Sequence, residues 1–110
     1  MAYSQGDVVW AWLPYSNGIG GENRPVLVVS AINRGKDITV AQITGQIRKS
    51  RKRRYDYVLR RWSEAGLSYP AAIRPKLFVI LKGRVSGRIG RLHDEDRAGM
   101  MAMLANLFGI

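Results

Sequence analysis

The sequence predicts a mainly β fold with one C-terminal helix, arranged as a small, strongly bent antiparallel barrel. Short apolar runs suited to β-strands recur along the chain, and many of its 12 glycines separate them. A clear helical pattern occurs once, after residue 93. Many short strands and one helix are typical of small barrels. At 110 residues, the chain is expected to form a single domain, 1–110.

Three strands are expected in the first half of the chain. The first, 6–13, is apolar on both sides, so one side is expected to face the core and the other a second contact. Residues 14–23 are rich in glycine and indicate a long flexible connection. The second strand is expected at 25–31, starting at Pro25, because proline has a fixed φ and no N–H. A turn at 33–35 then leads to a third strand at 38–43.

The middle of the chain is harder to assign. The first part of the basic segment 48–61 shows no usable periodicity, whereas Tyr55, Tyr57 and Leu59 alternate as in a strand. An irregular connection or one helical turn is expected at 62–70, a strand at 77–81, and a short twisted stretch at 84–89.

The terminal helix is expected to start at Asp94, because three acidic residues there suit the positive end of the helix dipole. His93 is interpreted as its N-cap or as a surface residue, and Gly109 as its stop. Its core face is expected to comprise Ala98, Met101, Leu104, Ala105 and Phe108. The opposite face carries Met100, Met103 and Leu107, which predicts burial against a second protomer.

The composition limits the function classes. The chain has 18 Lys and Arg against 8 Asp and Glu, a net charge of +10, which is expected for a partner that is a polyanion. The absence of cysteine excludes disulfides and thiolate metal sites, and a single histidine argues against a histidine-based zinc centre. No cofactor or metal is expected. The sequence shows no signal-peptide pattern and no apolar run long enough for a membrane span, so a cytoplasmic location is expected.

Arg24 is the first candidate site residue. It stands where a glycine-rich loop meets an apolar strand, and the planar donors of a guanidinium suit a phosphate. The simpler alternative is that Arg24 braces the loop through hydrogen bonds to carbonyl groups. Thr44, at the end of the third strand, has a similar alternative, since a threonine hydroxyl there often caps a turn.

The order of these residues resembles the PemK/MazF family of toxin–antitoxin ribonucleases. The resemblance starts at Gly6-Asp7-Val8-Val9-Trp10 and includes the run from Arg24 to Ser30. It continues through Ile43-Thr44, Ala65-Gly66-Leu67 with Pro70, and Ile73-Arg74, and ends at Ile89-Gly90-Arg91-Leu92. Two positions depart from the family pattern: Ala71 replaces a common serine, and Lys76 replaces an acid found in well-studied members.

The resemblance implies an SH3-like (CcdB/PemK-like) barrel that forms a homodimer and is neutralised by an antitoxin. It also implies cleavage of single-stranded mRNA without a metal, by attack of the RNA's own 2′-hydroxyl. The family's catalytic pair corresponds to Arg24 and Thr44, and a further RNA-binding or catalytic arginine corresponds to Arg74. The residues do not identify a general base.

The basic run is the other candidate RNA contact, because arginines beside aromatic residues can stack on unpaired bases. The alternative is a solvated loop without a ligand. The candidate RNA-binding residues are Arg74, Asn17 in the glycine-rich loop, and the run Arg48, Lys49, Arg51, Lys52, Arg53, Arg54 and Tyr55. Trp10 and Trp12 are expected in the core or an interface rather than on RNA.

The expected partners are single-stranded RNA and an acidic, partly disordered antitoxin segment that complements the basic surface. Two other functions stay open: a barrel that binds RNA or DNA without cutting it, and a CcdB-like inhibitor of a protein target such as gyrase.

Overall fold

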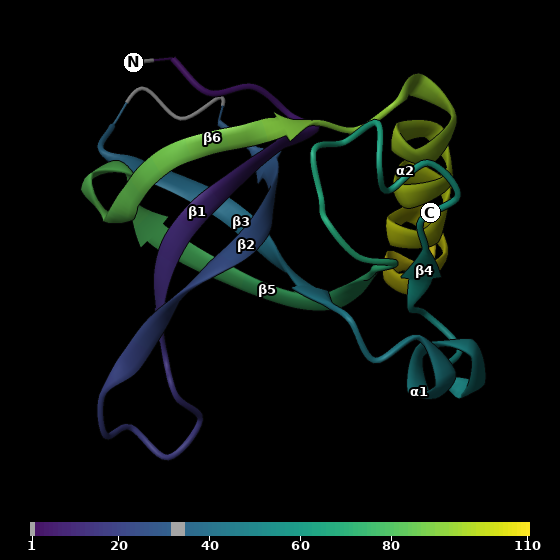
Figure 1. Ribbon diagram of the computed structural model, residues 1–110, viewed down its shortest axis with the longest axis horizontal. Helices are drawn as coiled ribbons and strands as arrows, with labels where there is room; N and C mark the ends of the chain where they lie inside the picture. Colours follow the sequence, from purple (N-terminus) through teal and green to yellow (C-terminus); the bar gives the residue numbers. More distant parts are fainter. Residues whose placement is uncertain (1, 32–34) are drawn as a thin grey trace.

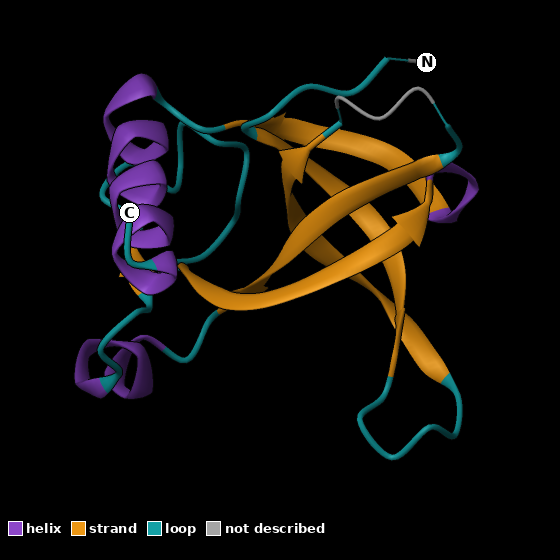
Figure 2. Ribbon diagram, turned by 180° about the vertical axis from the view of Figure 1, so that it is seen from behind, coloured by secondary structure: helices purple, strands orange, loops and turns teal. Residues whose placement is uncertain are grey.

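Six β-strands form one antiparallel sheet in the computed structural model, which describes residues 2–31 and 35–110. The sheet order is β4-β5-β3-β2-β1-β6, and the sheet is strongly curved (Figure 1). Helix α2 stands against one end of the sheet, and the short helix α1 lies below it (Figure 2). The elements are β1 (Asp7–Pro14), β2 (Gly21–Ser30), β3 (Asp37–Thr44), α1 (Ile47–Lys52), β4 (Tyr57–Val58), β5 (Ala72–Leu81), the 3-10 turn η1 (Lys82–Arg84), β6 (Val85–Arg91) and α2 (Asp94–Phe108). The predicted class, a bent antiparallel β fold with a C-terminal helix, is confirmed.

Apolar side chains form two separate cores because β1, β2 and β3 are buried on both faces. Val8 of β1 belongs to the core beneath α2, together with Leu27, Ile43 and Met100. Its neighbour Val9 points the other way, into a second core inside the curve of the sheet. This explains why the first strand is apolar on both sides. The outer part of β1 is less covered: Trp10 is 43% exposed, and the guanidinium of Arg84 lies over the half-buried Trp12 ring, 4.6 Å from its centroid.

Strand β2 starts four residues earlier than the sequence predicted. The β1–β2 pairing extends to Leu13 opposite Glu22 and Pro14 opposite Gly21. Gly21 packs so closely on the Leu13 carbonyl oxygen that no β-carbon would fit there. Pro25 is therefore the fifth residue of β2 and not the first, and it lies one residue before the described β2–β3 register. The turn predicted at 33–35 falls mostly outside the described residues, because Asn33 and Arg34 are not among them.

The middle of the chain also differs from the prediction. The first part of the basic run lies in helix α1, which the sequence did not predict because so many adjacent charges show no helical periodicity. The strand expected from Tyr55 to Leu59 is reduced to β4, two residues long. Strand β5 starts at Ala72 and not at 77, because 72–74 pair with the end of β3 across a register shift. The segment 62–70 is irregular, as expected.

Helix α2 starts and stops where the sequence predicted. His93 caps it, with Nδ1 accepting a hydrogen bond from the Glu95 N–H at 3.1 Å, and Gly109 ends it with φ of +72°. The predicted core face was wrong in part: the buried residues are Asp96, Met100, Met103 and Leu104. Met100 and Met103, predicted to contact a second protomer, pack in the core of this chain instead. Met101 and Phe108 are exposed. No helix in the described ranges is long and apolar enough to cross a bilayer.

Candidate functional site

Arg24 lies within β2, opposite Ala11 of β1, where the sheet holds its backbone on a regular strand. Gln42 of β3 binds its guanidinium. With the Gln42 amide oriented so that its oxygen faces Arg24, that oxygen accepts from Nη1 and Nη2, both at 3.1 Å. The carboxylate of Glu22 lies 3.8 Å from Nε, and the Arg24 side chain is 34% exposed. The guanidinium is therefore fixed from one side and accessible to a ligand from the other.

A hollow of about 430 Å³ opens beside Arg24. One wall is the β1–β2 connection, including Tyr15 and Asn17, and the other is β5, through Lys76 and Phe78. Gln42 and Arg24 form part of the same lining. Two of the lining residues are cationic, and none is a carboxylate. The hollow therefore combines positive charge and aromatic rings, which suits an anionic ligand that also carries rings.

Thr44 ends β3 on the same side of the sheet as Arg24. The described register ends at Val26 opposite Gln42, and Arg24 and Thr44 lie two residues beyond it on their respective strands. Thr44 is 6% exposed, and its Oγ1 accepts a hydrogen bond from the Gln46 N–H at 3.1 Å. The hydroxyl thus caps a turn, as the simpler alternative predicted, while its own proton stays free to be donated.

Arg74 on β5 pairs with Gln42 of β3, so three strands bring Arg24, Gln42 and Arg74 to one region of the sheet. Asp56, whose side chain is only 1% exposed, holds Arg74 through an Nε–Oδ2 contact of 3.3 Å. The same carboxylate also pairs with Arg53, with 3.4 Å between Arg53 Nε and Asp56 Oδ1. Nη2 of Arg74 is buried and has no hydrogen-bond partner within the described part of the chain. Asp56 thus joins the basic run to β5.

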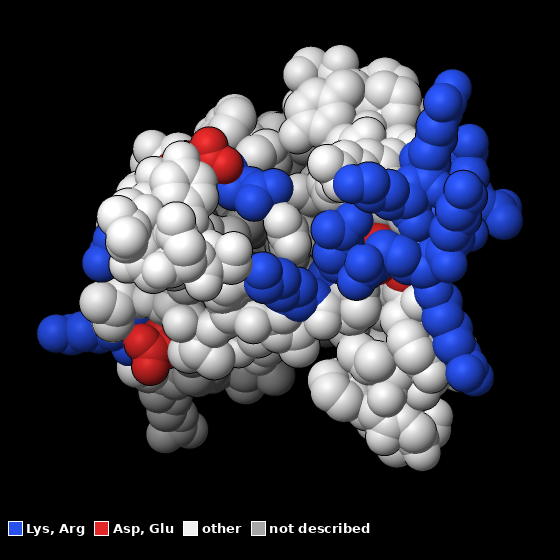
Figure 3. Space-filling model, turned by 90° about the horizontal axis from the view of Figure 1, so that it is seen from below, with Lys and Arg blue, Asp and Glu red and all other residues white. Residues whose placement is uncertain are grey.

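The basic run forms an exposed surface around α1. Its six cationic residues are all exposed: Arg48, Lys49, Arg51, Lys52, Arg53 and Arg54. The guanidinium of Arg54 lies over the half-buried Tyr55 ring, 5.3 Å from its centroid. Lys and Arg side chains cover the α1 end of this face and extend toward its middle (Figure 3). Such a surface attracts polyanions strongly at low salt.

Asn17 lies in the β1–β2 connection, where its Oδ1 accepts a hydrogen bond from the Ile19 N–H at 2.9 Å. It lines the hollow, so the structure brings it near Arg24 and apart from most of the basic run. Sequence reasoning did not identify Gln42, Phe78 or Asp56 as site residues, and it noted Lys76 only as a departure from the family pattern. Asp56 gave a signal as the single acid in a run of cations, and Lys76 gave one as a cation in place of an acid.

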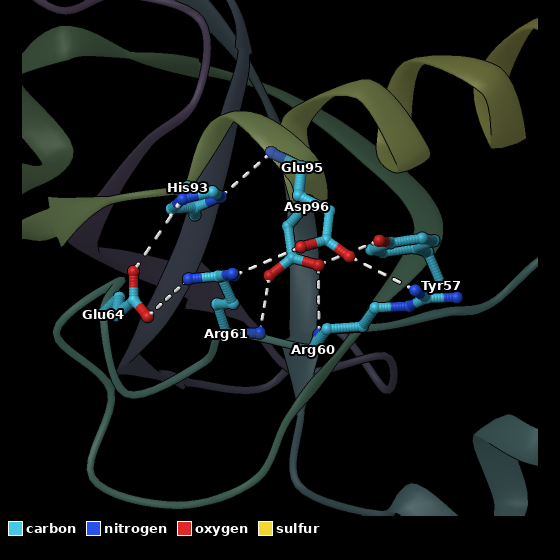
Figure 4. Close-up of polar contacts among 7 residues, drawn as sticks. All are labelled: Tyr57, Arg60, Arg61, Glu64, His93, Glu95 and Asp96. Carbon is cyan, nitrogen blue, oxygen red and sulfur yellow. Dashed lines mark hydrogen bonds and ion pairs between the residues drawn. The ribbon is translucent and has the colours of Figure 1, made fainter.

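A buried carboxylate holds the end of the basic segment against α2 (Figure 4). Asp96 is fully buried and accepts from the Tyr57 hydroxyl at 2.8 Å and from the N–H groups of Arg60 and Arg61 at 3.0 and 2.8 Å. Burial, together with the bond to Asp96, raises the pKa of Tyr57 to about 12. Hydrogen bonds to Glu95 and Glu64 raise the pKa of Arg61.

Comparison with known proteins identifies relatives of this fold. The model of the family described as PemK-like, MazF-like toxin of type II toxin–antitoxin system matches residues 4–108. The toxin MazF-mt6 of Mycobacterium tuberculosis is similar with a TM-score of 0.75 and 19% identity, over 94% of this chain and 97% of that one. A MazE-MazF structure from Deinococcus radiodurans (Form-III) gives a TM-score of 0.77 and 16% identity, over 100% of this chain and 99% of that one.

A mycobacterial endoribonuclease in complex with its cognate antitoxin has a TM-score of 0.72 and 15% identity, over 99% of this chain and 95% of that one. No curated protein sequence gives a match. At these identities, the structural likenesses establish a shared fold.

Proposed function

Because this chain belongs to the family of PemK-like, MazF-like toxins of type II toxin–antitoxin systems, we propose that it is an endoribonuclease that cleaves single-stranded RNA at selected sequences. The observation that carries the proposal is the setting of Arg24. Gln42 holds its guanidinium, the Glu22 carboxylate lies 3.8 Å from its Nε, and Arg24 lines a hollow whose lining includes no carboxylate. Exposed cationic residues also surround α1, where they form a basic surface that suits a polyanion (Figure 3).

The reaction needs few protein groups, because RNA supplies its own nucleophile. The 2′-oxygen forms a bond to phosphorus while the bond from phosphorus to the 5′-oxygen breaks. The proton of the 2′-hydroxyl leaves to a base, and the departing 5′-oxygen takes up a proton. The products are a 2′,3′-cyclic phosphate and a 5′-hydroxyl. Positioning and charge stabilisation account for most of the catalysis in such transfers.

Arg24 is proposed to bind the scissile phosphate and to stabilise the negative charge that builds up on it. A guanidinium stays protonated near neutral pH, so it stabilises charge better than it moves protons. Phosphate would enter on the Nε side, where Glu22 now lies at 3.8 Å. Thr44 is proposed to donate its hydroxyl proton to a phosphate oxygen, since its own oxygen already accepts from Gln46.

Arg74 is proposed to act near the same phosphate, with Asp56 fixing its orientation. The basic run, with Tyr55, is proposed to bind the RNA strand on one side of the cut, and Asn17 to contact it on the other. No cofactor or metal is part of this proposal.

The proposed partners follow from charge and from the relatives. Solved relatives include an endoribonuclease bound to its cognate antitoxin and MazE-MazF complexes. We propose that this chain is likewise neutralised by an antitoxin, through an acidic segment that lies on the basic surface, and that it forms a homodimer.

The test is incubation of the purified protein with a long single-stranded RNA in EDTA, followed by mapping of the new 5′ ends. Discrete cuts bearing 5′-hydroxyls are expected. Arg24→Ala is expected to slow cutting by about 10²–10³, the usual cost of removing one charge-stabilising donor. The matched control is Arg60→Ala, which removes the same charge beside α2 and is expected to cut like the wild type.

Activity of Arg24→Ala close to that of the wild type would refute the assigned role. RNA that shifts in a gel but stays intact would favour the barrel that binds without cutting. RNA that neither shifts nor breaks, combined with inhibition of a topoisomerase, would favour the CcdB-like alternative.

A further inference from the structure

The hollow beside Arg24 contains groups that a phosphate site alone does not need. Phe78 of β5 is half-buried against the second core, and the ammonium of Lys76 lies 5.7 Å from its ring centroid. Both residues line the hollow with Gln42. An aromatic ring with one accessible edge or face, next to a charge-bearing donor, is the usual composition of a nucleobase site.

The polar groups of this hollow are mainly donors. The Gln42 oxygen already accepts from both Nη atoms of Arg24, so the amide group offers a ligand only its nitrogen. The Asn17 oxygen accepts one hydrogen bond, from the Ile19 N–H. Lys76 has three N–H donors and no acceptor. The hydroxyls of Tyr15 and Ser16 can donate or accept, so a ligand that enters the hollow meets more donors than acceptors and gains most by bringing acceptors.

Two other hollows lack this character. The one beside α2 that includes Arg97 also contains Asp94, and the one beside Tyr55 contains Asp56. A carboxylate in the lining repels phosphate and accepts from amino groups. At about 430 Å³, the hollow beside Arg24 lies within the range of small-molecule sites.

We infer that this hollow binds the nucleobase adjacent to the scissile phosphate, and that it selects bases with a carbonyl oxygen at the position of uracil O4 and guanine O6. Uracil and guanine present such an oxygen where cytosine and adenine present an amino group. The base stacks on Phe78, and Lys76 moves from the ring face to donate to the carbonyl oxygen. Lys76 and Phe78 are thus specificity-determining residues. This inference rests on the proposed RNA cleavage for its biological meaning but is tested by binding alone.

The experiment uses two 2′-O-methyl oligonucleotides of about eight nucleotides, one of uridine and one of cytidine, within the usual span of single-strand sites. They resist cleavage and differ at the base edge in question. Their affinities are measured by fluorescence anisotropy for the wild type, Lys76→Met and the control Lys36→Met. Lys36 is exposed and comes just before the start of β3, whereas Gln42 lies near the end of that strand. The control therefore removes the same charge at a place away from the hollow.

The wild type is expected to bind oligouridine at least about 5-fold more tightly than oligocytidine, the lower end of what one base-edge contact contributes. Lys76→Met is expected to bring this ratio close to one, and Lys36→Met to leave it unchanged. Phe78→Leu is expected to weaken binding of both probes by about 5-fold or more through lost stacking, and Phe78→Tyr to restore it.

A wild-type ratio near one, or a preference for oligocytidine, would overturn the inference. The inference would also be overturned if Lys76→Met lowered the affinity for both oligonucleotides by the same factor, because that result would indicate a general effect of charge. Thermal unfolding of each variant verifies that it is folded. If cleavage in EDTA fails while the Lys76-dependent ratio is found, the proposed function falls and the base site stands. If Arg24-dependent cleavage is found without that ratio, the base site falls alone.

Discussion

The hydrogen bond between Tyr57 and Asp96 makes a sharp prediction about stability and its dependence on pH. Tyr57 donates to Oδ1 of Asp96 at 2.8 Å, and Asp96 is fully buried. The change is Tyr57→Phe, which removes one hydroxyl and keeps the ring. We expect a loss of about 1.5–3 kcal/mol at pH 8, the usual worth of a hydrogen bond to a charged group. The whole fold is expected to have about 5–15 kcal/mol of stability.

The pKa of Tyr57, raised from 10.0 to about 12, fixes the direction of the pH effect. The folded state holds the phenol proton more tightly than the unfolded state, so this stabilisation is complete below pH 10. It is lost as the pH rises from 10 through 12, because the phenolate is then held in a partly buried place and faces the Asp96 carboxylate. Because the ring is partly exposed, a shift of this size corresponds to only about 1–2 kcal/mol of stability.

The assay is urea unfolding of wild type and Tyr57→Phe, followed by the fluorescence of the three tryptophans, at pH 8 and near pH 12. The variant should be less stable at pH 8, and the two proteins should converge in the alkaline range. In thermal unfolding, the difference at pH 8 should be roughly 4 °C for each kcal/mol. Equal stability at pH 8, or a gap that stays constant up to pH 12, would refute this account of the contact.

Two further predictions concern α2 and α1. In Gly99→Ala, the new β-carbon would overlap the Tyr57 ring, so we expect net destabilisation in urea, because overpacking costs about 1–3 kcal/mol and helix propensity returns at most about 1 kcal/mol. An unchanged or higher midpoint would contradict this packing. In Arg48→Gln/Arg51→Gln, the slope of log K against log salt for RNA binding should decrease by about 1.4, near 0.7 for each lost phosphate contact. An unchanged slope would mean that these exposed side chains do not contact phosphate.

Local signals predicted the ends of α2 and the apolar centres of β1, β2, β3 and β5, because capping residues and strand patterns act over a few residues. They failed where pairing with a distant strand decided the outcome. Gly21, Glu22 and Asn23 have the composition of a loop, yet the hairpin with β1 makes them strand. Ala72 to Arg74 are strand because the end of β3 lies beside them.

The face of α2 shows a second kind of failure. Periodicity treats an aspartate as a solvent-facing residue, whereas Asp96 is buried because a hydroxyl and two N–H groups from 57–61 satisfy it. Those donors come from more than 30 residues away. The candidate site shows the same limit. Arg24 and Thr44 could be named from the sequence, but Gln42 and Asp56 have roles only because the fold places them beside Arg24 and Arg74.

The Asp96 contacts have a consequence for how this molecule can change over evolution. They fix the chain to α2 at Tyr57, and the pairing of Thr44 with Ala72 of β5 fixes it at the end of β3. Between these two fixed points, most residues of 45–54 are exposed, and Ser50 is the buried exception. Apart from Arg53, which pairs with the buried carboxylate of Asp56, its outward residues can therefore be substituted with little loss of folding stability. The affinity of this surface for a polyanion can therefore change through substitutions that leave the fold unchanged.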